Sequence, residues 1–221
     1  QRIATEVTAE VTVTSVTLSL GRSRFTDDDP ASDTRITTSF GVDLSHERDN
    51  GTISIGLSVA RTEDGTRESL TFGRNFELAQ GTLDVKLGLT RGVSGGTTVT
   101  GSLGWQQELP NGALSAAVKR SVGPGADDGE RVISTLSLGL SRDLGPLTGL
   151  NLGLNYVDSE ETATGASVTN ADLSASVSHA LTPDWSLDVG YTHRLRDTST
   201  GPEASSDTLF LSIGRDFSFR P

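Results

Sequence analysis

The chain has 221 residues, the size of one ordinary domain, and its hydrophobic residues amount to only 33%. No apolar run approaches the ~20 residues of a transmembrane helix, so none is predicted. The net charge of -11 excludes nucleic acid as a partner, because phosphate binding requires a basic surface.

The first predicted strand begins near the N-terminus and changes phase. Its apolar residues share one parity up to Val13 and the other parity from Val16 onward. One extra residue in a strand moves every later side chain to the opposite face. We therefore predict one long strand with a β-bulge near Thr14 and Ser15. A second strand follows at about 34–46 and ends in an Asn50-Gly51 hairpin turn.

From this turn onward a hairpin unit repeats. Rising strands with alternating polarity begin at Gly51, Gly81, Gly112, Gly149 and Trp185, and falling strands of similar pattern lie between them. Such self-similarity indicates one copied supersecondary unit. Short turns at one end of the strands alternate with mostly longer, acidic connections at the other end, including 124–130, 158–167 and 197–207. We call the first end the short-turn rim and the second the long-loop rim. The count is about twelve antiparallel strands.

The last stretch, Thr208 to Pro221, carries the clearest alternation. Leu209, Leu211, Ile213, Phe217 and Phe219 share one parity, and small or polar residues share the other. An amphipathic final strand that ends in aromatic residues resembles the closing strand of Gram-negative outer-membrane β-barrel proteins, including the porin-like ones. In that family a terminal phenylalanine is read by the barrel-assembly machinery, whereas here Arg220 and Pro221 follow Phe219.

The resemblance implies an all-β fold, an antiparallel up-and-down transmembrane β-barrel of about 12 strands that spans residues 1–221 as a single domain. It implies a bacterial outer-membrane location, with short turns and both termini periplasmic, and lipopolysaccharide as a neighbour. No leader precedes Gln1, so we expect that a signal peptide has been removed or that the chain belongs to a longer protein.

Alternation alone also fits a soluble β-sandwich, whose apolar face points inward. Two features favour the barrel. The polar face is built from small residues such as Ser137, Gly139 and Gly153 rather than from Lys and Glu. Aromatic residues lie towards strand ends, where barrels have aromatic belts; these are Phe76, Trp105, Trp185, Phe217 and Phe219 at the short-turn rim and Phe25, Tyr156 and Tyr191 at the other.

Charged residues of polar parity are the candidate pore lining, because such charges set ion preference in channels. They are Asp43, Asp84, Lys86, Glu108, Lys119, Asp172, Asp188 and Arg194. The same side chains could instead pair across the interior and plug it. Arg61, Arg91 and Arg120 end three rising strands on the apolar parity, where they would bind lipid phosphates or simply extend to the membrane surface.

Catalysis has little support, and the sequence predicts that the chain is not an enzyme. His46, His179 and His193 all fall on the apolar parity, as in outer-membrane phospholipase A. However, Leu195 occupies the place where a same-face serine would be required. No metal-ligand spacing or phosphate loop is present, so neither a metal nor another cofactor is expected.

The sequence therefore predicts a narrow passive channel for ions or small solutes in the outer membrane. The alternative is a structural or anchoring barrel without conductance, either the membrane domain of a larger surface protein or a subunit of an envelope assembly. Its partners would be the lipid bilayer, lipopolysaccharide, the assembly machinery and an envelope protein or a second copy. A soluble β-rich module is the third interpretation.

Overall fold

A computed structural model describes residues 2–25, 35–124 and 129–215. These ranges form thirteen β-strands. They are β1 (Arg2–Val11), β2 (Thr14–Phe25), β3 (Arg35–Arg48), β4 (Gly51–Arg61), β5 (Thr66–Leu78), β6 (Gly81–Arg91), β7 (Thr97–Leu109), β8 (Gly112–Pro124), β9 (Glu130–Gly145), β10 (Thr148–Glu161), β11 (Ser167–Thr182), β12 (Trp185–Thr198) and β13 (Ala204–Arg215). Within the described ranges no helix is long and apolar enough to cross a membrane.

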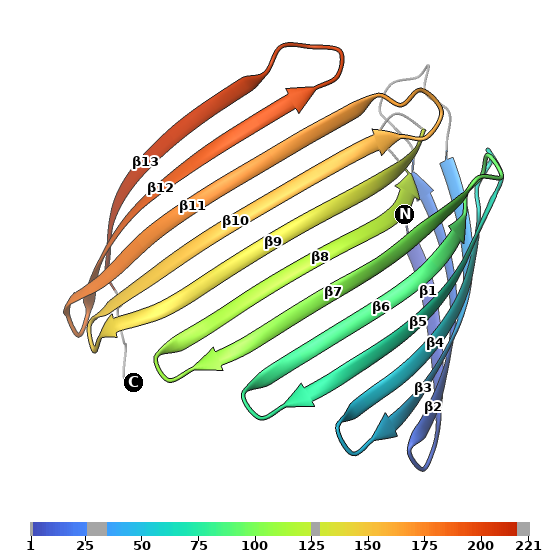
Figure 1. Ribbon diagram of the computed structural model, residues 1–221, viewed down its shortest axis with the longest axis horizontal. Helices are drawn as coiled ribbons and strands as arrows, with labels where there is room; N and C mark the ends of the chain where they lie inside the picture. The colour runs from blue at the N-terminus through green and yellow to red at the C-terminus, as the bar shows by residue number, and fades with distance from the viewer. Residues whose placement is uncertain (1, 26–34, 125–128, 216–221) are drawn as a thin grey trace. The chain divides into compact units, whose positions relative to one another are not determined.

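The thirteen strands follow one another in chain order, each hydrogen-bonded to the next, from β1 to β13 (Figure 1). The neighbouring strands from β1 to β5 and from β9 to β13 all pair in antiparallel fashion. The prediction of an all-β, antiparallel, up-and-down fold is confirmed. The strand number is thirteen rather than about twelve.

The extra strand comes from the N-terminal segment, where the predicted β-bulge is wrong. The chain reverses at Thr12 and Val13, and Thr12 has a φ of 59°. The hairpin pairs Val11 with Thr14 and Val7 with Leu18. Odd positions of β1 and even positions of β2 therefore share one face, which accounts for the change of phase without an inserted residue.

An odd strand number also changes where β1 begins. Arg2 pairs with Ser23, close to the end of β2 that leads into the long-loop rim. The prediction that both termini lie at the short-turn rim is therefore wrong for the start of β1. At the other end of the chain, Arg215 pairs with Trp185, the first residue after a short turn. Phe217 and Phe219, on which the family resemblance rests, lie outside the described residues.

The short turns are uniform. Six connections contain two residues each, and they are 12–13, 49–50, 79–80, 110–111, 146–147 and 183–184. Gly51 and Gly112 follow two of these turns with φ of 122° and 148°, a region that favours glycine. Two-residue turns fix the register of each hairpin, so they also fix which side chains share a face.

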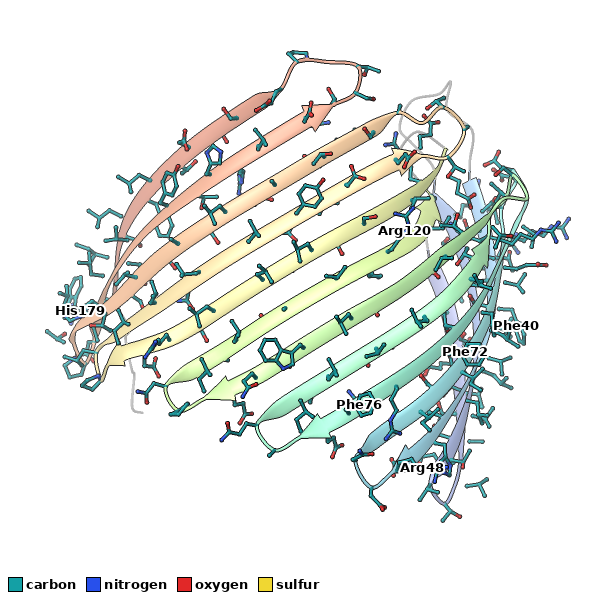
Figure 2. All side chains as sticks on the ribbon, viewed as in Figure 1. Phe40, Arg48, Phe72, Phe76, Arg120 and His179 are labelled. Atoms are coloured by element: carbon teal, nitrogen blue, oxygen red, sulfur yellow. The ribbon has the colours of Figure 1, made fainter. Side chains whose placement is uncertain are left out.

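The described chain divides into two compact units. Unit 1 contains residues 1–78, 83–103 and 120–124, and unit 2 contains 79–82, 104–119 and 125–221. In unit 1, Phe40 pairs with Val59 and Leu57 pairs with Leu70, so apolar side chains meet across the strands. Figure 2 shows Phe40 and Phe72 pointing away from the same side of these strands. The opposite face pairs Gly41 with Ser58.

Unit 2 repeats this division of faces. Leu154 lies between Leu138 and Leu173, whereas its neighbour Asn155 lies between Ser137 and Asp172. The alternation read from the sequence is thus an apolar face and a polar face in each unit, matched strand to strand.

Burial is the reverse of that in a water-soluble domain. Among the described residues no hydrophobic side chain is buried, and large apolar side chains such as Leu57 at 55% and Leu209 at 78% are exposed. The buried positions are glycines and two threonines, most of them of polar parity, namely Gly41, Gly51, Gly56, Gly88, Thr90, Gly92, Thr100 and Gly190. All of these except Gly190 belong to unit 1, and other residues of the polar face, such as Asp43 and Ser58, are exposed.

Candidate functional site

Small side chains let the polar face pack closely. In unit 2 the Ser174 hydroxyl donates to the Gly153 carbonyl at 3.4 Å, and a Cβ at Gly153 would stand 2.7 Å from that hydroxyl oxygen. In unit 1 a Cβ at Gly56 would stand 2.5 Å from the carboxylate oxygen Oδ1 of Asp43. Glycine at these positions leaves room for a polar side chain on the neighbouring strand.

The charged residues predicted to line a pore lie on the polar faces of the two units. In unit 2, Asp172 pairs in register with Arg194, and the carboxylate Oδ1 lies 3.2 Å from Nε of the guanidinium. Asp188 lies between Ser178 and Ser212. Glu108 on β7 and Lys119 on β8 are exposed.

In unit 1, Asp84 and Lys86 lie two residues apart on β6. The ammonium of Lys86 is 3.8 Å from the carboxylate of Asp84. Asp43 lies between Thr17 and Gly56 and is exposed. Two of the predicted acids thus have a basic partner, so part of the charge on the polar face is neutralised locally.

One polar-face residue was missed from the sequence. Phe210 has polar parity on β13 and pairs with Gly190 on β12. A Cβ at Gly190 would come within 2.2 Å of the Phe210 ring, so the ring lies directly over the glycine backbone. The sequence alone could have indicated this residue, because Phe210 shares its parity with the small residues Ser212 and Gly214.

The three arginines proposed to contact lipid phosphates are exposed residues of apolar parity. Arg61 pairs with Thr38 on one side and Thr66 on the other. Arg91 ends β6, and Arg120 lies in the second half of β8 (Figure 2).

A hydrogen-bonded cluster near the long-loop rim was also missed. The Tyr191 hydroxyl donates to Asp207 Oδ1 at 2.5 Å, and His193 Nδ1 lies 2.7 Å from the same oxygen. An ionised carboxylate only accepts, so Nδ1 must carry the proton, which leaves Nε2 of the neutral ring as an acceptor. The β12–β13 register, which pairs His193 with Asp207, was the signal that could have revealed the cluster.

The Asp207→Asn substitution tests the hydrogen bond between Asp207 and His193. The amide oxygen is a weaker acceptor than a carboxylate, so the preference for a proton on Nδ1 should fall. The ¹⁵N shifts of the imidazole nitrogens measure this directly. His179, whose Nδ1 lies 2.8 Å from the Thr148 hydroxyl, is the internal control and should not change. An unchanged His193 spectrum would contradict the assigned hydrogen bond.

Within the described ranges no group of three or more His, Asp or Glu residues could hold a metal ion. No protein-family model matches the chain, and no curated protein matches it in sequence. Among solved structures, the chain is similar to OmpT (in-vitro folded), an outer membrane protein of Vibrio cholerae, with a TM-score of 0.49 and 11% sequence identity. The similarity covers 96% of this chain and 85% of that chain.

The prediction that the chain is not an enzyme is corrected here. Asp207, fourteen residues from His193 in sequence, lies 2.7 Å from its imidazole Nδ1, so the lack of a serine near His193 does not exclude catalysis.

Proposed function

We propose that the chain is an outer-membrane β-barrel that acts as a narrow passive channel for ions or small solutes. The observation that carries this proposal is the exposed apolar face of each unit. Large apolar side chains are exposed on one face of each unit, and no hydrophobic side chain of the described residues is buried. A bilayer is the solvent that suits an exposed apolar face, because only alternate residues of a membrane strand need to contact lipid.

The proposed membrane location also requires a closed sheet. An open edge in the hydrocarbon region would leave backbone N–H and C=O groups without partners, at a cost of several kcal/mol each. A closed barrel has no such edge. Odd-numbered membrane barrels exist. The cations Arg61, Arg91 and Arg120 would then face lipid phosphates, including those of lipopolysaccharide.

The polar faces would line the lumen, and Asp188 is the best site for testing this. It lies between two serines, and within the described part of the chain it has no ion-pair partner. The interaction energy between an unpaired charge and a passing ion is about 1 kcal/mol at ~4 Å in water. This energy corresponds to about a fivefold change in the local ion concentration.

Single-channel recording in planar bilayers is the test. The wild-type chain should give stepwise conductance, and Asp188→Lys should move the permeability ratio towards anions by about fivefold. Asp184→Lys, in the turn 183–184, makes the same change of charge outside the strand and should have little effect.

A second outcome would favour the alternative function. The Asp172–Arg194 and Asp84–Lys86 pairs neutralise charge on the polar face, as in barrels whose interior is filled. Stable insertion without any conductance would therefore overturn the channel and support a structural or anchoring barrel.

A further inference from the structure

Phe210 is an aromatic residue on a face of unit 2 that β12 and β13 otherwise build from small and polar side chains. A Cβ at Gly190 would meet the ring carbons Cε1 and Cζ of Phe210, so the ring lies across the backbone of β12. Gly190 is buried, whereas Phe210 is 42% exposed. One part of the ring therefore packs on the sheet, and the rest is accessible to a ligand on the polar face.

The register places polar residues around this ring. Gly190 also pairs with Ser176 on β11, whose Cβ would stand 3.1 Å from a Cβ at Gly190. Asp188 precedes Gly190 by two residues on the same face of β12, a distance of about 7 Å along a strand. Ser178 and Ser212 are the partners of Asp188 on the two neighbouring strands. The ring thus has one carboxylate and several hydroxyl groups as neighbours.

Neither the ring nor the carboxylate has a cation of the chain beside it. Among the described residues, arginines lie over two other rings, those of Phe76 and Trp185, at 4.9 and 5.2 Å from the ring centres. In the same part of the chain no cation lies over Phe210, and Asp188 makes no ion pair or side-chain hydrogen bond. Both groups are therefore available to a cation from outside the chain.

We propose that Phe210 and Asp188 form a binding site for small organic cations, namely ammonium groups that carry alkyl substituents. The face of an aromatic ring attracts such a cation within about 6 Å of the ring centre. A carboxylate about 7 Å further along the strand lets one cation lie between the two groups. The proposal rests on the channel proposed above and adds the class of solute that its polar face selects.

Other solutes fit this site less well. Asp188 repels a small anion, and the nearest guanidinium on this face of β12, that of Arg194, already pairs with Asp172. A potassium ion has no alkyl groups with which to remove the apolar surface of the ring from water. A neutral sugar stacks on a ring but gains nothing from an ionic attraction to Asp188. The combination of ring and carboxylate therefore favours a cation with an apolar surface.

Block of the potassium current by tetramethylammonium tests this site. The full chain is recorded in planar bilayers in potassium chloride while tetramethylammonium is added, and the wild-type conductance should fall. Phe210→Leu should raise the half-blocking concentration by about two- to fivefold, as expected for the loss of an exposed cation–π contact. Asp188→Asn should raise it by about fivefold, because the ionic attraction is lost.

Phe72→Leu is the matched control. It is the same substitution on the apolar face of unit 1, where Phe72 pairs with Ile55, and it should leave the block unchanged. A potassium current that tetramethylammonium does not reduce would overturn the cation site. Equal block of the wild type and Phe210→Leu would also overturn it and would leave the ring as a cover for Gly190.

Saturation-transfer NMR in micelles of a deuterated nonionic detergent measures binding without any conductance. The wild-type chain should transfer saturation to the methyl protons of tetramethylammonium, and the transfer should be weaker for Phe210→Leu. A chain that binds tetramethylammonium in this way but does not conduct would overturn only the channel. A chain that conducts but does not bind it would overturn only the cation site.

Discussion

Replacing Leu154 with Arg should lower the free energy of unfolding of the chain in a bilayer by about 2–4 kcal/mol. This is the cost of an arginine on the lipid face near the membrane midplane. Leu154 lies near the middle of β10 between Leu138 and Leu173, so its side chain belongs to the apolar face of unit 2. A guanidinium there must either leave the hydrocarbon region or draw water into it. Urea titration of the folded chain in phosphatidylcholine vesicles measures the loss.

Asn155→Arg is the matched control for this prediction. Asn155 is the next residue, at almost the same depth, but on the polar face, where its amide oxygen accepts a hydrogen bond from the Ser137 hydroxyl at 2.9 Å. Losing this bond should cost about 1 kcal/mol. Equal losses for the two variants would contradict the assignment of the faces. A wild-type chain that stays folded and dispersed in buffer without detergent would contradict the proposed membrane location.

The two faces were predictable because period-two alternation needs only the sequence. Leu154 and Asn155 differ in polarity, and the register confirms that each meets residues of its own kind. Turns such as Asn50-Gly51 and Asn111-Gly112 were predictable for a similar reason, since glycine after asparagine is a strong hairpin signal.

The first hairpin was missed because its turn lacks such a signal. Thr12 and Val13 are β-branched residues that ordinarily continue a strand, and Thr12 adopts a left-handed φ of 59° that is rare for its type. The change of phase was detected, but a bulge and a two-residue reversal alter parity in the same way. Only the pairing of Val11 with Thr14 separates them.

The candidate site was predictable by face but not by partner. Parity assigned Asp172 and Arg194 to the polar face, yet their ion pair depends on the register between β11 and β12. The same holds for His193 and Asp207, which are fourteen residues apart and meet only through the β12–β13 hairpin. That register depends on the connection 199–203, whose length does not identify a turn type.

The turn at 110–111 offers a sharp test of the repeated hairpin. Gly112 has a φ of 148°, and a Cβ there would stand 2.0 Å from the Ser141 carbonyl oxygen and 2.9 Å from the Cα of Arg142. The turn is held against β9 by a hydrogen bond from the Asp143 N–H to the Asn111 carbonyl at 2.9 Å. Gly51 is similar, since its Cβ would stand 2.2 Å from the Asn75 carbonyl oxygen. Backbone atoms that close leave no space for a side chain.

Gly112→Ala should therefore destabilise the folded chain by at least about 1–3 kcal/mol, the cost of holding a residue in a sparsely populated backbone region, because the clash adds to it. Gly145→Ala is the control, since a Cβ at Gly145 meets no atom within 4 Å and its φ is not in the left-handed region. That variant should stay within about 1 kcal/mol of the wild type, and a small gain is reasonable because alanine restricts the unfolded chain. Urea unfolding in the same vesicles compares both. If Gly112→Ala were no less stable than Gly145→Ala, the close approach of the turn to β9 would be wrong, and with it the register that places Asn111 beside Asp143.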